Sequence, residues 1–112
     1  MRTVLSVTID TQVGNQAIID GPDNGGVMAQ VIQDTLDELK PEAAYFYTDR
    51  GERHGIIVFE LDDQTRIPSI AEPLFQKLGA RVTFSPVMTA EDLQVGFQKL
   101  AERQSAGRST RI

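Results

Sequence analysis

The chain has 112 residues, of which 40% are hydrophobic and 24% are charged, a composition typical of one globular domain and not of a disordered segment. Its net charge of −5 disfavours binding to the phosphates of nucleic acids. The absence of cysteine excludes disulfides, thiolate metal sites and cysteine nucleophiles. The N-terminus lacks a signal-peptide pattern and no apolar run could span a bilayer, so we expect a cytoplasmic protein without membrane association.

A strand and a helix are predicted in the first forty residues. Residues 2–9 alternate with period two and include several β-branched side chains, which predicts a strand. Residues 11–26 read as a long connection with one helical turn, ending in GPDNGG. This cluster lacks the spacing and the lysine of a phosphate-binding loop, so we interpret it as a flexible lead-in to a helix, or as a lid. Residues 27–40 carry apolar side chains at helical spacing and stop before Pro41.

Residues 43–61 predict two strands joined by a tight turn at Arg50 and Gly51. In this hairpin Tyr47 lies opposite His54, and Phe46 lies opposite Gly55. The first face then carries Ala44, Phe46, Ile57, Phe59 and Leu61, and the second carries Tyr45, Tyr47, His54, Ile56, Val58 and Glu60.

The second main helix is predicted over residues 67–80. Ser69 and Glu72 have the spacing of a capping box, which would put Pro73 at the fourth helical position. Gly79 is expected to end the helix. If the capping box forms, Glu72 is a capping acid without a chemical role.

A strand and a final helix complete the predicted order. Residues 81–87 read as a fourth strand, and Thr89 is the expected N-cap of a helix with an apolar stripe at Leu93, Phe97 and Leu100. The order is βαββαβ plus a C-terminal helix, in one α+β domain over residues 1–103. Residues 104–112 are expected to form a flexible tail. The same order occurs in RNA-recognition modules, but the central strands lack the aromatics and the surface lacks the positive charge that RNA binding requires.

Three segments carry a resemblance to a known family. KPEAAYF, AEPLF and PVMTAEDL, in this order and spacing, resemble a family of small bacterial proteins of uncharacterised function, over nearly all of residues 2–102. The resemblance implies a ferredoxin-like fold with an antiparallel four-stranded sheet, and a dimeric α/β barrel in which two sheets pack face to face. The wider superfamily includes antibiotic-biosynthesis monooxygenases, muconolactone isomerase-like enzymes, haem-binding proteins and stress-responsive members. No catalytic motif of these groups is present in this sequence.

The sheet face away from the predicted helices holds the candidate site. Its apolar residues Val4, Ile56 and Val58 indicate a covered surface, either a subunit interface or a pocket wall. The predicted ligand-binding residues on this face are Ser6, Thr8, Tyr45, Tyr47, His54 and Arg81. His54 is the only histidine and could exchange a proton near pH 7, with Tyr47 positioning a substrate oxygen. It could also be an interface residue without chemistry.

Three functions are compatible with this pattern. The first is a homodimer that binds a small apolar or aromatic molecule. The second is a cofactor-independent oxygenase or isomerase that uses Tyr47 and His54, and the third is a structural or regulatory dimer without a ligand. No cofactor is expected, and no metal either, because the sequence has no histidine pair or carboxylate cluster at metal-binding spacing. An enclosed cavity at His54 would favour an enzyme, and a filled interface would favour the third function.

Overall fold

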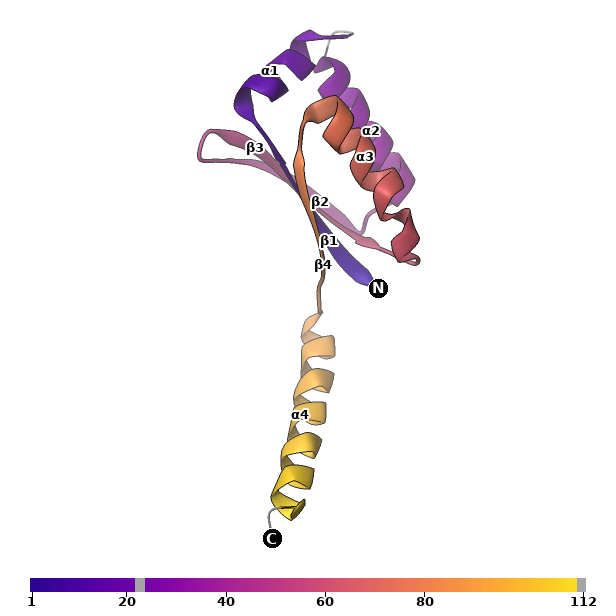
Figure 1. The fold of residues 1–112 in the computed structure, drawn as a ribbon, viewed down its shortest axis with the longest axis vertical. Coiled ribbons are helices and arrows are strands. Elements are labelled where there is room, and N and C mark those ends of the chain that lie inside the picture. The colour runs from indigo at the N-terminus through magenta and orange to yellow at the C-terminus, as the bar shows by residue number, and fades with distance from the viewer. Residues whose placement is uncertain (22–23, 111–112) are drawn as a thin grey trace.

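The computed structural model describes residues 1–21 and 24–110, and it has an α+β architecture built on one antiparallel sheet (Figure 1). The strands β1 (Arg2–Ile9), β2 (Ala43–Asp49), β3 (Glu52–Glu60) and β4 (Arg81–Pro86) lie in the order β2-β3-β1-β4. The helices are α1 (Thr11–Ile19), α2 (Gly26–Leu39), α3 (Ile67–Leu78) and α4 (Ala90–Thr110), with a 3₁₀ turn η1 (Gln64–Arg66) before α3. The helices α1, α2 and α3 lie on one side of the sheet, an arrangement compatible with a ferredoxin-like fold.

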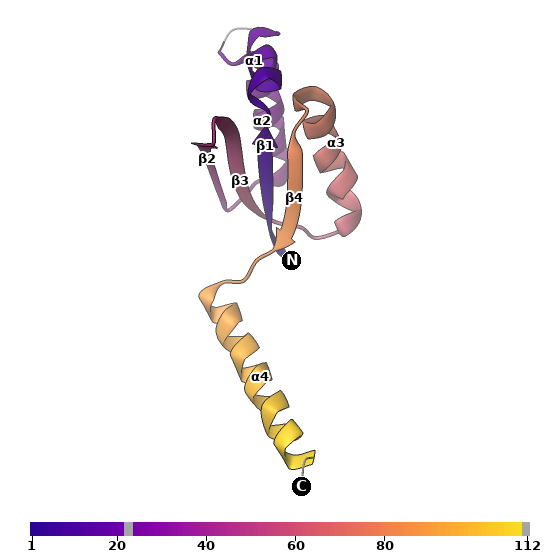
Figure 2. The same cartoon turned by 60° about the vertical axis from the view of Figure 1, so that its left-hand side comes forward.

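The core lies between the sheet and these three helices. Along β1 every second side chain is buried, as the period-two pattern predicts. The most deeply buried large side chains come from β1, β3 and α3, and they are Leu5, Phe59, Ile70, Leu74 and Leu78. The opposite side of the sheet, which we call the open face, has no helix of this chain over it in the described structure (Figure 2).

The predicted hairpin register is confirmed. Tyr47 pairs with His54 and Phe46 pairs with Gly55, on either side of the turn at Arg50 and Gly51. A Cβ atom added at Gly55 would lie 2.9 Å from two carbon atoms of the Phe46 ring, so the glycine makes room for this ring.

The expectation of a single helical turn after β1 is wrong, because α1 is a helix of nine residues. Asp10 caps it by accepting hydrogen bonds from the backbone N–H groups of Gln12 and Val13. Gly14 and Ala17 are its buried residues, and their small size leaves no apolar stripe that a periodicity analysis would detect. The GPDNGG lead-in and its function as a lid cannot be placed as a whole, because residues 22–23 lie outside the described residues.

The predicted capping box at Ser69 and Glu72 is also wrong. α3 already begins at Ile67, directly after η1. The Ser69 hydroxyl donates to the carbonyl of Arg66, and the Glu72 carboxylate accepts from the side-chain amide of Gln76, so the two residues do not form the reciprocal bonds of a capping box. Pro73 therefore lies inside the helix and not at its fourth position. The turn that leads into α3 is instead capped by Asp63, which accepts from the backbone of Thr65. The predicted C-cap is confirmed, since Gly79 adopts a left-handed conformation with φ of 57°.

The predicted N-cap at Thr89 is confirmed, and it forms the reciprocal bonds of a capping box with Asp92. The backbone N–H of Asp92 donates to Thr89 Oγ1 at 3.1 Å, and the backbone N–H of Thr89 donates to Asp92 Oδ2 at 3.0 Å. The hydrogen bond from the Thr89 backbone, followed by the hydrogen bond from the Thr89 side chain, holds the pKa of the Asp92 carboxyl below its usual value. The carboxylate is therefore in its bonding form at neutral pH and fixes the start of α4.

Beyond this cap, α4 extends away from the rest of the chain (Figure 1, Figure 2). It continues through Thr110, so residues 104–110, expected as a flexible tail, are helical. Every residue from 90 to 107 is exposed. None of the described helices is both long enough and apolar enough to cross a membrane.

Candidate functional site

The open face is organised in rows that cross all four strands. From β2 to β4, the first row is Tyr47, His54, Thr8 and Arg81. The second row is Tyr45, Ile56, Ser6 and Thr83, and the third is Ala43, Val58, Val4 and Ser85. All six residues predicted to bind a ligand therefore lie in the first two rows, side by side. The third row is apolar over three strands, and beyond it the charged residues Arg2 and Glu60 pair on the same face.

His54 is held from both sides within the first row. Its ring stacks on the ring of Tyr47, with centroids 5.3 Å apart and an interplanar angle of 17°. On the other side, Thr8 Oγ1 lies 3.0 Å from His54 Nδ1, within hydrogen-bond distance. The direction of this bond depends on which ring nitrogen carries the proton. The ring is therefore oriented by a phenol and a hydroxyl, and Nε2 is the nitrogen left to exchange a proton with a ligand.

Replacing Thr8 with valine should release the His54 ring. We expect a loss of about 1 kcal/mol in the free energy of unfolding, the usual contribution of one hydrogen bond between uncharged groups. The ¹⁵N chemical shift of Nδ1, measured by NMR, should change at the same time. The matched control is Thr83→Val, an exposed threonine on the same face in β4. Equal effects of the two substitutions on the His54 ring would contradict the bond to Thr8.

Arg81 ends the first row and is engaged by a carboxylate. Its Nη2 atom lies 3.1 Å and 3.3 Å from the two carboxylate oxygens of Glu52, which reaches it across the sheet from β3. In the described residues the hydrogen-bond partner of the His54 ring is the Thr8 hydroxyl and not a carboxylate, so no acid orients the imidazole in the manner of a catalytic triad. Within residues 1–21 and 24–110, no group of three His, Cys, Asp or Glu side chains is placed to hold a metal ion.

A groove lies on the other side of the sheet, between α2 and the hairpin of β2 and β3. It has a volume of about 400 Å³. Most of its lining is apolar, and these residues are Val7, Ile9, Met28, Ile32, Phe46, Ile57 and Leu74. The groove exists because β2 is an edge strand that pairs with β3 and is not covered by the helices, so Phe46 remains 51% exposed at its rim. The groove is therefore accessible from solvent.

Most polar groups of the groove lie at the hairpin end, and one, Thr35, lies on α2. Arg53 lines the groove there, with Nη2 donating to Asn15 Oδ1 at 2.9 Å and Nη1 donating to the carbonyl of Thr11 at 3.4 Å. Gly14 allows this approach, because an added Cβ would lie 2.6 Å from Arg53 Nη1. Thr35, also in the lining, is buried and gives its hydroxyl proton to the carbonyl of Val31. The groove thus combines apolar walls with one cation.

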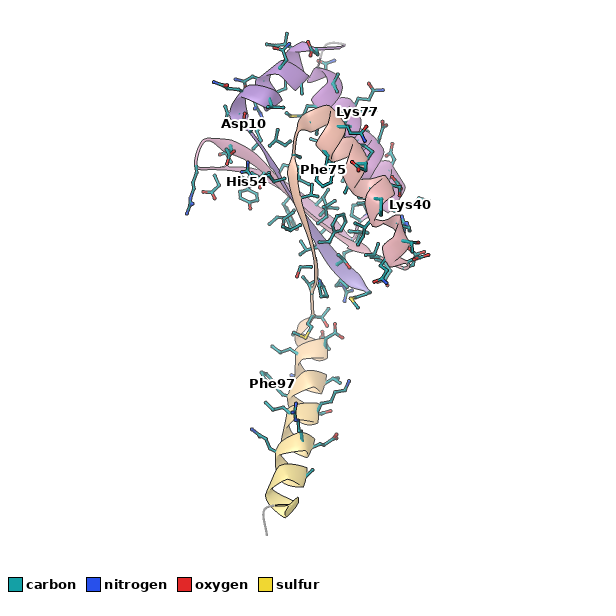
Figure 3. The ribbon with its side chains drawn as sticks, viewed as in Figure 1. Asp10, Lys40, His54, Phe75, Lys77 and Phe97 are labelled. Atoms are coloured by element: carbon teal, nitrogen blue, oxygen red, sulfur yellow. The ribbon has the colours of Figure 1, made fainter. Side chains whose placement is uncertain are left out.

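The groove and the rows of the open face are two separate sites. Tyr47 and His54 border the groove, but strand alternation places their side chains on the open face, and Figure 3 shows His54 on the hairpin. The other predicted binding residues Ser6, Thr8, Tyr45 and Arg81 do not line the groove. Sequence reasoning missed Arg53, Phe46 and the α2 residues Met28 and Ile32 as site residues. The available signal was Phe46, a large ring on an edge strand opposite a glycine.

Comparison with known proteins adds support for the fold. No family model matches the chain, and no curated protein matches it. A solved structure of an uncharacterized protein from Thermotoga maritima is similar, with a TM-score of 0.52 and 15% sequence identity over 78% of this chain and 96% of that chain. At this identity the similarity concerns the backbone alone. The chain is thus a small α+β protein with a four-stranded antiparallel sheet, similar in fold to that Thermotoga protein.

Proposed function

We propose that this protein binds a small apolar or aromatic molecule in the groove between α2 and the hairpin. The observation that carries the proposal is the groove itself, about 400 Å³ in volume and lined mainly by aliphatic side chains and Phe46. Pockets for small ligands usually measure roughly 300–1,000 Å³ and combine apolar walls with a few polar groups. Burial of an apolar ligand in such a groove is favourable because it removes apolar surface from water on both sides.

Arg53 adds a preference for an acidic group at one end of the ligand. A guanidinium carries five N–H donors in a planar fork, and the described bonds of Arg53 go to Asn15 and to the Thr11 carbonyl. The remaining donors suit a carboxylate or sulfonate held at the hairpin end. The ligand class is then an amphiphilic anion, with an apolar or aromatic body lying along α2 and its acidic group at Arg53.

Two fluorescent probes test this proposal. 1-Anilinonaphthalene-8-sulfonate has an apolar body and an anionic group, and N-phenyl-1-naphthylamine has a similar body without charge. We expect both to bind, and Ile32→Trp, which fills the groove from α2, should weaken both at least about 10-fold. Arg53→Gln should weaken only the sulfonate, by about 10-fold, the loss of one charge-assisted hydrogen bond.

The matched control for the groove-filling substitution is Ile19→Trp, at a 72% exposed position of α1 outside the groove. Probe affinities that stay the same in Ile32→Trp would show that the probes bind elsewhere, for example on the open face. Equal losses of both probes in Arg53→Gln would contradict the acidic group in the ligand.

We also propose a homodimer that covers the open face. Val4, Ile56 and Val58 lie on this face only partly buried, and no helix of the same chain covers them in the described structure. Sedimentation at micromolar concentration should give twice the chain mass of 12.4 kDa. A monomer at this concentration would contradict the dimer. The sequence resemblance implies one form of this assembly, the dimeric α/β barrel with the two sheets in direct contact.

A second candidate function is that of a cofactor-independent oxygenase or isomerase. The observation that favours it is the row in which Thr8 and Tyr47 orient the His54 ring on the face proposed to be covered by the second copy. Chemistry there would place the reacting molecule between two subunits, with His54 as the proton acceptor. A structural or regulatory dimer without a ligand is the remaining outcome, if neither probe binds and no small molecule shifts the His54 resonances.

A further inference from the structure

We infer that the surface covering the open face in the dimer is α4 of the second copy, so that the two chains exchange their C-terminal helices. This inference rests on the proposed dimer and specifies which surfaces meet in it. α4 is 21 residues long, and every described side chain from 90 to 107 is exposed. In proteins most of the stability of a helix comes from packing of an apolar face against a partner.

The helix has such a face. Leu93, Phe97 and Leu100, which we call the α4 stripe, are 42%, 59% and 49% exposed. At about 100° per residue they fall within an arc of about 60°. Val95, with 48% exposure, lies about 160° away from Leu93 on the other side of the helix. Figure 3 shows Phe97 projecting from α4 without a neighbouring element of its own chain.

The start of α4 places the helix correctly for an exchange. Asp92 in its first turn lies 4.0 Å from Arg2, whose side chain belongs to the same face of β1 as Val4. From there the helix leaves its own sheet beyond the end where β1 begins (Figure 1, Figure 2). A two-fold axis beside Thr89 would lay each α4 along the open face of the other copy.

Helix exchange covers the exposed α4 stripe as well as the open face, whereas direct contact of the two sheets covers the open face alone. A helix of 21 residues is about 31 Å long and about 10 Å wide, and about 23 Å of this length can lie along the strands, a footprint of about 230 Å². Each chain contributes one helix and receives one, so the two chains bury about 900 Å² by these flat footprints. The four strands, about 4.8 Å apart and about 23 Å long, give about 900 Å² for two sheets in contact.

The first test compares two substitutions on opposite sides of the same helix. Phe97→Gln removes the centre of the α4 stripe, and Val95→Gln is the matched control; glutamine keeps the helix propensity and adds no charge. Because neither side chain packs against the core, the fold of the remaining chain should be unaffected. By analytical ultracentrifugation, we expect Phe97→Gln to raise the dimer dissociation constant at least about 25-fold, as at an interface hot spot. Val95→Gln should change it by less than about 3-fold.

The second test distinguishes exchange between chains from other helix contacts. A variant with an altered open face, Val4→Gln with Ile56→Gln, should also dissociate. Mixed with the Phe97→Gln variant, it should form a heterodimer, because the intact α4 of one chain meets the intact open face of the other. In a homodimer of either variant, both contacts between α4 and the open face contain a substituted surface. Circular dichroism and thermal unfolding of each variant check that both remain folded.

Each remaining outcome overturns a different statement. A monomeric wild type rejects the dimer and the exchange together but leaves probe binding in the groove untouched. A wild-type dimer that survives Phe97→Gln rejects the exchange and supports direct contact of the sheets. Dissociation of Phe97→Gln without a heterodimer on mixing indicates that α4 packs against α4 or against its own chain, and it also rejects the exchange.

Discussion

Replacement of Phe59 with alanine should remove a large part of the free energy of unfolding and leave the protein only marginally stable. Phe59 is 1% exposed, and its ring meets that of Phe84 edge-on at a centroid distance of 6.5 Å. Removal of a buried phenylalanine ring costs the transfer free energy of the ring plus the cavity it leaves, about 3–5 kcal/mol. Domains of this size are commonly stable by about 5–15 kcal/mol. Urea unfolding at a fixed protein concentration measures the loss.

The matched control is Phe75→Ala on α3. Phe75 is 44% exposed, so its ring already has access to water and its removal leaves no closed cavity. We expect a loss below about 1 kcal/mol. Similar losses for the two substitutions would mean that Phe59 is not in the centre of the core.

Replacement of Gly26 with alanine should be the most damaging small substitution. Gly26 begins α2 with φ of 58°, and an added Cβ would lie 2.3 Å from the carbonyl oxygen of Asp20 and 2.4 Å from that of Ile18. These are backbone atoms at the end of α1, which cannot rotate away as a side chain can. The substitution would force α1 and α2 apart, and we expect a loss of about 3 kcal/mol or more in thermal or urea unfolding.

Gly51 provides the control for the backbone conformation alone. It has φ of 77° in the hairpin turn, and no atom lies within 4 Å of an added Cβ. Gly51→Ala should therefore cost only the left-handed conformation, about 1–2 kcal/mol. The difference between the two substitutions isolates the contact between α1 and α2. If Gly51→Ala were as damaging as Gly26→Ala, the clash at Gly26 would not be the cause.

The hairpin could be predicted from sequence because its determinants are local. The alternation of side chains and the Arg50-Gly51 turn fix the register, and the register brings the residues of the first row together. Capping was harder to predict. Ser69 and Glu72 have the same spacing as Thr89 and Asp92, but only the second pair forms a box. The first pair fails because the turn capped by Asp63 has already started the helix upstream.

The helix α1 and the groove depend on packing between distant segments. α1 is stabilised by its docking through Gly14 and Ala17, two residues without a strong helical pattern. The groove arises because the helix layer does not reach β2 at the edge of the sheet. Neither property is encoded in a periodicity along the chain. Sequence reasoning therefore located the residues of the open face but not the cavity on its reverse side.

The position of β2 at the edge of the sheet also affects the concentration at which the protein begins to aggregate. One side of this strand pairs with β3, and three aromatic residues in succession, Tyr45, Phe46 and Tyr47, are 69%, 51% and 47% exposed along it. Such an edge can add a strand from another molecule and start aggregation. At neutral pH the net charge of −5 keeps molecules apart. Near the isoelectric point of about 4.7 this repulsion vanishes, and we expect association of copies through β2 to be most favourable there.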